Sequence, residues 1–275
     1  MANPKILLDQ HQINPKKNWG QNFLHDPNAL EKIVATAELM PEDIAVEIGT
    51  GTGTLTAVLA QHARHVISIE IDERLRPILE EQLAPYDNVH LLFDDFLDID
   101  ILQIVGSKGF VVVANIPYYI TSKIIRRLLD THRRPKRLVL TVQYELAERI
   151  IAEPPDMSIL AISVQFYGAT QIVTRLKPGA FWPRPDVDSA VIKIDTYDTP
   201  KVDVPSTKRF FQVVRAGFGQ KRKQLRNSLG NGIGIKSSAA GILLEEAEID
   251  PKRRAETLTL EEWAMLTRIV HKELG

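Results

Sequence analysis

The sequence predicts an α/β fold: a mainly parallel sheet, followed by a smaller, mainly helical C-terminal domain. Short runs of β-branched residues alternate with helical patterns through the first two hundred positions. Glycine or polar residues follow the predicted strands directly. A proline-containing, weakly hydrophobic segment at 196–206 then separates this region from one with helical patterns alone. We therefore expect a domain over residues 1–200, beginning with a mobile polar arm at 1–18, and a second over 201–275.

The composition is that of a globular protein, with 44% hydrophobic residues and a net charge of −1. The chain has no cysteine, which excludes disulfides and thiolate metal sites and fits a reducing cytoplasm. We find no apolar run long enough for a membrane span and no apolar signal segment. His62 and His65 lie one helical turn apart without a third ligand. We expect a cytoplasmic protein that uses neither a membrane nor a metal.

The first predicted strand, Ile44–Ile48, runs into Gly49-Thr50-Gly51-Thr52-Gly53. Alternating glycines permit a tight turn and a close approach to a ligand, although a plain strand-to-helix turn explains them equally. The spacing differs from the dinucleotide motif. The next strand, His65–Glu70, ends in an acid about 20 positions later, where a carboxylate can accept both hydroxyls of a ribose. A solvated charge would explain Glu70 alone. Together the two features favour a cofactor that contains a nucleoside.

A third strand, Val89–Phe93, is followed by Asp94, Asp95 and Phe96. Asp94 can be explained as an ordinary charged residue of a loop. Asp95 is the better ligand candidate, because the neighbouring ring of Phe96 could cover an adenine.

The fourth strand, around Val111–Val113, ends in Asn115-Ile116-Pro117-Tyr118. The proline stops strand pairing and places the turn at the carboxyl edge of the sheet, where ligands of open α/β sheets bind. An amide, a carbonyl and an aromatic face at one turn could hold a flat molecule that carries an amine, such as a nucleobase. Taken alone, the stretch fits a plain turn with an asparagine cap equally well.

The other expected elements are less distinctive. Residues 207–244 carry basic side chains and no Asp or Glu, which favours an RNA-facing surface over a merely solvated helix. Its RNA-binding candidates are Lys221, Arg222, Lys223 and Arg226. Further strands are expected at 138–142, 159–166, 169–176 and 187–194, an irregular segment at 178–185, and helices at 27–40, 55–60, 122–130, 145–151, 208–214 and after a capping box at Thr259.

In their order and spacing, several of these segments resemble the KsgA/RsmA-type rRNA adenine N6,N6-dimethyltransferases, which share a fold with the Erm enzymes. The resemblance covers nearly the whole chain and implies a Rossmann-like, S-adenosylmethionine-dependent methyltransferase sheet. The chain departs from the family pattern at Thr50, where proline is common, and at 156–160. The segments that carry the resemblance are 20–24, 47–53, 70–72, Asp95, 115–118, 181–190 and 218–229.

The resemblance implies S-adenosylmethionine as the cofactor. Glu70 would hold the ribose hydroxyls, and Asp95 would accept from the adenine amine, with Phe96 alongside. The residues that would surround the methionine end are Asn22, Leu24, Gly49 and Gly51.

The resemblance also assigns the chemistry. Asn115 would sit where the methyl group meets the target amine, and its side-chain oxygen and the Ile116 carbonyl would accept the two N–H bonds. Pro117 shapes the turn. Tyr118 would stack on the target base and Phe181 would cover its other face. A base must leave its stack to enter such a pocket, so an adenine in a loop is the expected target.

The expected reaction is dimethylation of two adjacent adenines in the 3′-terminal hairpin loop of small-subunit (16S) rRNA, by a monomer acting on a pre-ribosomal particle. Three alternatives remain open, of which the weakest is a DNA or protein N-methyltransferase, since turns similar to Asn115–Tyr118 serve amines generally. An Erm-type enzyme would act on large-subunit (23S) rRNA, but the block at 218–229 and the long C-terminal domain favour the KsgA type. A non-catalytic RNA-binding assembly factor is disfavoured by the intact Glu70, Asp95 and Asn115–Tyr118.

Overall fold

The structure is a computed structural model that describes residues 3–16 and 19–274. The chain forms two compact units. The first comprises the chain up to Ala147 together with Ala169–Thr196, and the second comprises Glu148–Gly168 together with the chain from Tyr197. The chain passes between the units three times, and the last passage, after Thr196, falls close to the expected boundary at 200, whereas residues 148–168 pack with the C-terminal part of the chain.

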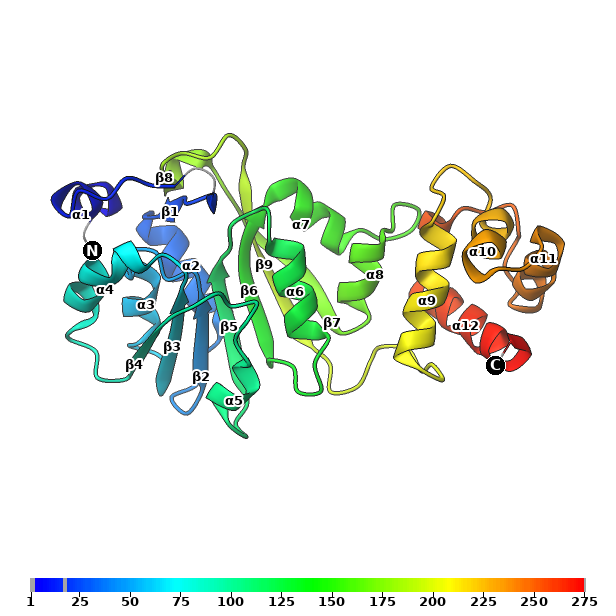
Figure 1. Cartoon of the computed structure of the whole chain (residues 1–275), viewed down its shortest axis with the longest axis horizontal. Coiled ribbons are helices and arrows are strands. Elements are labelled where there is room, and N and C mark those ends of the chain that lie inside the picture. Colours follow the sequence, from blue (N-terminus) through cyan, green and yellow to red (C-terminus); the bar gives the residue numbers. More distant parts are fainter. Residues whose placement is uncertain (1–2, 17–18, 275) are drawn as a thin grey trace. The chain divides into compact units, whose positions relative to one another are not determined.

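A seven-stranded sheet organises the first unit, in the order β4-β3-β2-β5-β6-β9-β7 (Figure 1). The pairs from β4 to β6 are parallel, and β9 runs antiparallel to β6. The chain proceeds from β2 toward one edge and later from β5 toward the other, so the carboxyl ends of β2 and β5 flank a topological switch point, where α/β sheets bind ligands. The strands are β2 (Ile44–Ile48), β3 (His65–Glu70), β4 (Val89–Phe93), β5 (Phe110–Asn115), β6 (Arg137–Gln143), β7 (Gly168–Leu176) and β9 (Ser189–Thr196).

Helices cover both faces of this sheet, which explains why its central strands are continuous apolar runs. All five residues of β2 are buried, as are five of the six in β5. Figure 1 shows α6 in front of the strands and α2 behind them. Besides α1 (Pro4–Gln10), the α-helices among the described residues of this unit are α2 (Pro27–Ala37), α3 (Thr54–Leu59), α4 (Arg76–Leu83), α5 (Ile101–Val105), α6 (Thr121–Leu129) and the start of α7 (Tyr144–Ile151).

The expectation of a mobile arm at 1–18 is wrong for the part that the structure describes; residues 1–2 and 17–18 lie outside it. Pro4–Gln10 form helix α1, whose first turn is capped by the Asn3 side chain. Leu7 and Leu8 are buried in a cluster with residues of α4, including Ile78 and Leu79. Two apolar side chains on a short polar helix are too weak a sequence signal to show docking, because only the partner helix makes them a core.

The strand expected at 159–166 is also wrong, because Ile159–Gln165 form helix α8. The Ser158 hydroxyl accepts from the backbone N–H of Ala161 at 3.1 Å and starts the helix. A short apolar run does not distinguish a buried strand from a buried helix, and here the cap decides. The segment expected to be irregular contains strand β8 (Phe181–Trp182), which pairs with β1 (Phe23–Leu24).

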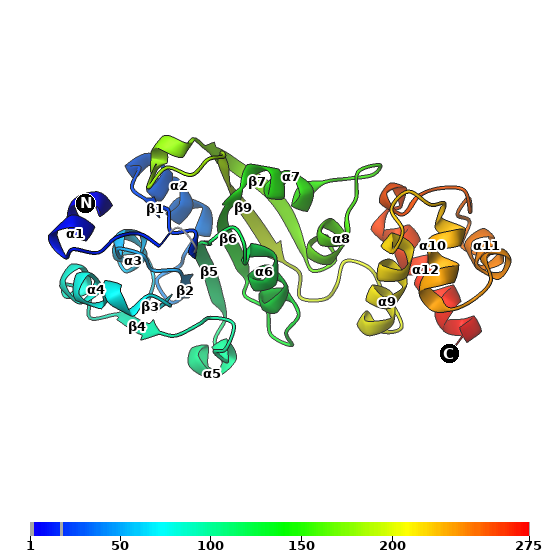
Figure 2. The ribbon, with the colours of Figure 1, turned by 45° about the horizontal axis from the view of Figure 1, so that its top comes forward.

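Four helices dominate the second unit, as the yellow-to-red part of Figure 2 shows. Helices α9 and α10 pack closely at Gly232, where an added Cβ would lie 2.5 Å from Ala216. The expected capping box is confirmed: Glu262 N–H donates to the Thr259 hydroxyl at 3.1 Å, and Thr259 N–H donates to Glu262 at 2.8 Å. The four helices are α9 (Thr207–Phe218), α10 (Leu225–Ile233), α11 (Ser237–Glu246) and α12 (Leu260–Leu274).

Candidate active site

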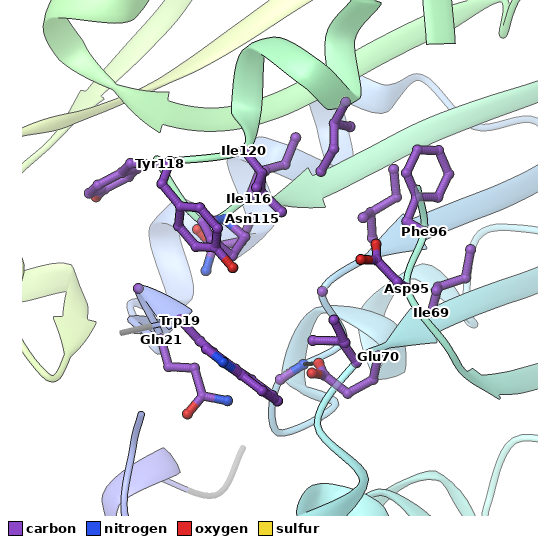
Figure 3. Close-up of a pocket in the computed structure, with 18 of the residues that line it drawn as sticks. Trp19, Gln21, Ile69, Glu70, Asp95, Phe96, Asn115, Ile116, Tyr118 and Ile120 are labelled. Carbon is purple, nitrogen blue, oxygen red and sulfur yellow. Dashed lines mark hydrogen bonds between the residues drawn. The ribbon is translucent and has the colours of Figure 1, made fainter. Parts of the chain in front are cut away.

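A cavity of about 320 Å³ lies at the carboxyl ends of β2, β3 and β5. Its walls come from three sources: residues 19–23, the turns after β2, β3 and β4, and the segment from Asn115 into α6. Figure 3 shows Asn115 and Tyr118 across the cavity from Glu70 and Asp95, with Trp19 on a further side. All of these residues belong to the first unit.

Glu70 ties the glycine turn to the end of β3. Its two carboxylate oxygens accept backbone N–H groups, one from Gly51 at 2.8 Å and the other from Asp72 at 2.9 Å. Burial raises the pKa of this carboxyl, while the backbone donors oppose the rise. Gly49 has a φ of +81°, and a Cβ there would come within 3.3 Å of the Asn115 carbonyl oxygen. Glycine is therefore required where the two strand ends meet.

A second acid, Glu47, lies beneath the turn. Its Oε2 accepts from the hydroxyls of Thr56 at 2.5 Å and Ser68 at 2.8 Å. The Ser68 hydroxyl also lies 2.7 Å from that of Thr50, inside the glycine turn. Complete burial raises the pKa of Glu47 to about 8, so at neutral pH its carboxyl is mostly protonated. The network joins β2, β3, α3 and the turn without placing a fixed charge under the cavity.

Asp95 lies in the turn after β4 and lines the cavity beside Phe96. Its Oδ1 accepts from the backbone N–H of Leu97 at 2.8 Å, which fixes the side chain and leaves Oδ2 for a ligand. Phe96 is 4% exposed and forms part of the wall. This turn therefore offers a hydrogen-bond acceptor next to an apolar surface.

The orientation of the Asn115 amide is set by a distant part of the chain. Its Nδ2 donates to the backbone carbonyl of Asn22 at 2.9 Å. The Oδ1 atom therefore remains as an acceptor at the cavity, next to the turn carbonyls that follow. The side chain of Asn22 in turn donates to the Gly20 carbonyl at 3.1 Å, which holds the short segment in place.

Tyr118 is fixed through its hydroxyl, which lies 2.7 Å from the Ser189 hydroxyl at the start of β9. Ser189 is fully buried. Burial raises the pKa of the Tyr118 phenol, so the hydroxyl remains protonated near neutral pH. Ser189 has no predicted role in the site, since residues 71 positions apart carry no local signal of pairing.

Residues 19–21 were also missed as part of the site. Gln21 donates to Asp72 at 2.8 Å and accepts from the backbone N–H of Lys16 at 2.7 Å. Asp72 is buried, which opposes ionisation, but hydrogen bonds from Arg74 and Gln21 keep its pKa below the ordinary value. Trp19 forms one wall of the cavity, and the Lys16 ammonium lies 3.5 Å from the centre of its ring.

Most of the predicted catalytic and cofactor-binding residues line the cavity, and two do not. Leu24 borders a narrow hollow behind the glycine turn. Phe181, expected to cover the target base, is 1% exposed and packs in the hydrophobic core with Leu24, so the structure does not bring its ring to the cavity. The predicted residues that line the cavity are Asn22, Gly49, Gly51, Glu70, Asp95, Phe96, Asn115, Ile116, Pro117 and Tyr118.

The four predicted RNA-binding residues belong to the second unit. Lys221, Arg222 and Lys223 are exposed in the turn between α9 and α10. Arg226 is half-buried and its Nε donates to the Gln224 side chain at 3.1 Å. Within residues 3–16 and 19–274, no group of three or more possible metal ligands occurs and no helix is long and apolar enough to cross a membrane.

The seven-stranded mixed sheet with helices on both faces is the α/β fold of the methyltransferases with a Rossmann-like sheet. The family model described as ribosomal RNA adenine dimethylase matches residues 12–268, and the chain belongs to this family. The family predicted from the motifs is thus confirmed.

Full-length relatives agree with this assignment. A protein of Clostridium botulinum named ribosomal RNA small subunit methyltransferase A is 44% identical over 272 residues, 98% of each chain. One of Dehalococcoides mccartyi with the same name is 41% identical over 267 residues, covering 97% of this chain and 92% of that protein.

Two solved structures match most of the chain. A dimethyladenosine transferase from Plasmodium falciparum superposes with a TM-score of 0.79 at 27% identity, covering 91% of this chain and 98% of that one. The 23S rRNA methyltransferase ErmE superposes with a TM-score of 0.74, also at 27% identity, covering 91% of this chain and 100% of that one.

Proposed function

We propose that the protein transfers methyl groups from S-adenosylmethionine to N6 of two adjacent adenines in the 3′-terminal hairpin loop of small-subunit (16S) rRNA. The reaction takes place on a pre-ribosomal particle in the cytoplasm. One observation carries the chemical part of the proposal: the Asn115 amide is fixed by Asn22, with its oxygen left as an acceptor at the cavity. The names of the relatives that are 41–44% identical support the choice of small-subunit rRNA.

The residues at the strand ends fit S-adenosylmethionine. Glu70 offers carboxylate oxygens for the ribose hydroxyls at the end of β3, where each oxygen holds one backbone N–H and has capacity for another donor. Asp95 keeps Oδ2 for the adenine amine, and the turn at Gly49–Gly51, where both glycines have a positive φ, lets the backbone come close to the methionine end. When bound, the cofactor supplies an electrophilic methyl group on a sulfonium.

The target amine is activated by position and polarity. The N6 lone pair of adenine is delocalised into the ring, which makes the amine a poor nucleophile. The Oδ1 of Asn115 and the carbonyl oxygen of Ile116 accept its two N–H bonds, and this favours a pyramidal nitrogen whose lone pair points away from the acceptors. Pro117 keeps the turn in the required shape. Preorganised acceptors of this kind act without a strong general base before attack, and the methylated nitrogen, which would carry a positive charge, would then release one proton to water.

The base itself is held by Tyr118. Its ring is oriented by the hydrogen bond to Ser189 and stacks on the adenine. Phe181 supports the β1–β8 pair from within the core, so we assign it a structural role in place of the predicted stacking one. The target adenine must be extruded from its stack to reach the cavity, which fits a loop nucleotide.

The exposed triplet 221–223, with Arg226, supplies phosphate contacts for the rRNA. Residues 207–244 contain no acidic side chain to compete for these cations. Such contacts provide affinity and orientation without reading the base sequence.

The decisive test offers the protein labelled S-adenosylmethionine with undermethylated small subunits and, separately, with protein-free large-subunit rRNA. We expect dimethyladenine in the small-subunit rRNA. Label that appears only in the large-subunit rRNA would replace the proposal with an Erm-type activity. The similarity to ErmE makes this comparison necessary.

The role of the amide is tested by Asn115→Ala. Loss of a preorganised polar contact in a transition state slows the reaction by about 100-fold or more, so we expect transfer to be nearly abolished. Cofactor affinity, measured by calorimetry, should largely survive. Asn28→Ala, at an exposed asparagine of α2, is the matched control. An active Asn115→Ala variant would remove the role given to the amide.

A further inference from the structure

The rim of the cavity carries a second tyrosine that the proposed reaction does not use. The backbone N–H of Ile120 donates to the Pro117 carbonyl at 3.2 Å, which makes Tyr118 and Tyr119 the two central residues of a β-turn. Tyr118 is held by Ser189, whereas the Tyr119 side chain is 63% exposed and lines the cavity. Its ring is therefore available to a ligand at the mouth of the cavity.

The ring of Tyr119 has a defined place on this rim. A Cβ built on Gly20 would lie 3.8 Å from Tyr119 Cδ1 and 3.6 Å from Pro117 Cβ, so the ring lies against the backbone of the N-terminal segment. Gly20 adopts a φ of +61°, which further favours glycine at this contact. The segment and the turn therefore meet at the rim.

Cationic side chains follow on helix α6, and one of them lies at the same rim. Helix α6 begins directly after the turn, and its exposed Lys123 also lines the cavity. Arg126 lies one turn further along α6 and is exposed as well. The amino end of α6 has no side-chain cap, and its positive dipole end adds to the charge of Lys123. Within the described chain, neither Lys123 nor Arg126 forms an ion pair with an acid.

We propose that Tyr119 and Lys123 form a second nucleotide subsite, which binds the RNA nucleotide next to the target adenine. Tyr119 stacks on the base of this nucleotide, and Lys123 contacts its phosphate. The inference rests on the proposed function and adds a substrate contact to it. An aromatic face combined with a cation is the usual recognition of single-stranded nucleic acid.

The chemistry of extrusion gives this subsite a purpose. When the target adenine leaves its stack, the neighbouring base loses a stacking partner. The exposed ring of Tyr119 replaces that partner, which lowers the cost of extrusion and keeps the neighbour at the mouth of the cavity. For two adjacent target adenines, the neighbour held at Tyr119 is itself the next or the previous target.

The test compares Tyr119→Leu with Tyr119→Phe, because leucine keeps an apolar side chain of similar length without an aromatic face. Methylation of undermethylated small subunits is followed with labelled S-adenosylmethionine, and cofactor affinity is measured separately by calorimetry. We expect Tyr119→Leu to raise KM for the subunits by about fivefold or more, as for loss of one base-stacking contact. Tyr119→Phe should stay within about twofold of the parent, and cofactor affinity should be unchanged in both.

Lys123→Gln tests the phosphate contact. We expect the slope of log affinity against log salt concentration to fall by about 0.7, the value for one phosphate contact of a single strand. Lys108→Gln is the matched control, since Lys108 is an exposed lysine just before β5, at the end of that strand opposite the cavity. An unchanged slope for Lys123→Gln removes Lys123 from the subsite.

Several results would overturn the stacking role of Tyr119. These are an unchanged KM for Tyr119→Leu, an equal loss in Tyr119→Phe, or a loss of cofactor affinity in place of RNA affinity. A parent protein that binds the cofactor but methylates neither RNA refutes the proposed function and the subsite together. An active parent with an equally active Tyr119→Leu variant refutes the subsite alone.

Discussion

Replacing Glu47 by glutamine should make the free energy of unfolding of the first unit less dependent on pH. Glu47 is completely buried, and burial raises its pKa from 4.5 to about 8. Glutamine keeps an oxygen that can accept from Thr56 and Ser68, at nearly the same volume, and removes the titratable proton. The variant therefore isolates the ionisation of one group with little change in packing.

The size of the effect follows from linkage between proton binding and folding. Below pH 4.5 the carboxyl is protonated in both the folded and the unfolded state, and its contribution to stability is fully present. As the pH rises from 4.5 to about 8, the unfolded chain releases this proton while the folded chain keeps it, and the contribution is progressively lost. The loss is about 1.4 kcal/mol per pH unit, so between pH 5 and pH 8 it reaches about 4 kcal/mol at most.

Urea unfolding of the parent and of Glu47→Gln at pH 5, 6, 7 and 8 measures this difference directly. All other titrating groups are shared, so the stability of the variant relative to the parent should rise steadily across the series. Glu153→Gln, at an exposed acid, should show no such trend. A difference for Glu47→Gln that stays constant from pH 5 to pH 8 would show that Glu47 is ionised in the folded protein, against the reasoning given for the buried network.

Other contacts of the site lead to further predictions. Ser189→Ala and Tyr118→Phe remove the same hydrogen bond, so each should slow methyl transfer by about two- to tenfold, and the double variant should be no slower than either single variant. If the two losses multiply in the double variant, the residues act independently and the hydrogen bond is not the cause. Asp72→Asn should lower stability in urea by about 2 kcal/mol at pH 7. The pKa of Asp72 is lowered in the folded state, so this difference should vanish as the pH falls through its ordinary value of 3.8 toward the folded pKa, and a difference that persists in acid would contradict it. Changing the triplet 221–223 to glutamine should weaken RNA binding and reduce its salt slope by about 2, and no change in either would mean a merely solvated surface.

The sequence predicted the sheet and the cavity because their signals are local. The strands that end at the site are short apolar runs, and the candidate ligand residues lie at the carboxyl end of a strand or within two residues of it, as Glu70, Asp95 and Asn115 do. Neighbouring parallel strands have their carboxyl ends at the same edge of the sheet. A residue at the end of any of these strands is therefore expected at that edge, close to the residues that end the others. The same logic fails for Phe181, whose proline-rich surroundings contain no pattern that shows which way the ring points.

The missed contributions come from contacts between distant segments. The pairing of Gln21 with Asp72 spans 51 residues, and that of Tyr118 with Ser189 spans 71. Neither pairing can be predicted from sequence periodicity, because a single hydrogen bond between distant residues produces no repeating pattern. Helix α8 was mistaken for a strand for the related reason that its apolar run is too short to display a helical period.

The hydrogen bond from Asn115 to the Asn22 carbonyl has a consequence for how the enzyme can be disabled. An asparagine amide can present either its oxygen or its nitrogen to the cavity, and among residues 3–16 and 19–274 the Asn22 carbonyl is the hydrogen-bond partner that selects between them. A change that displaces residues 20–22 would leave the sheet and the acids intact, yet would free the amide to rotate and offer donors to an amine that needs acceptors. Inactivating substitutions are therefore expected in this short early segment, in a protein that remains folded.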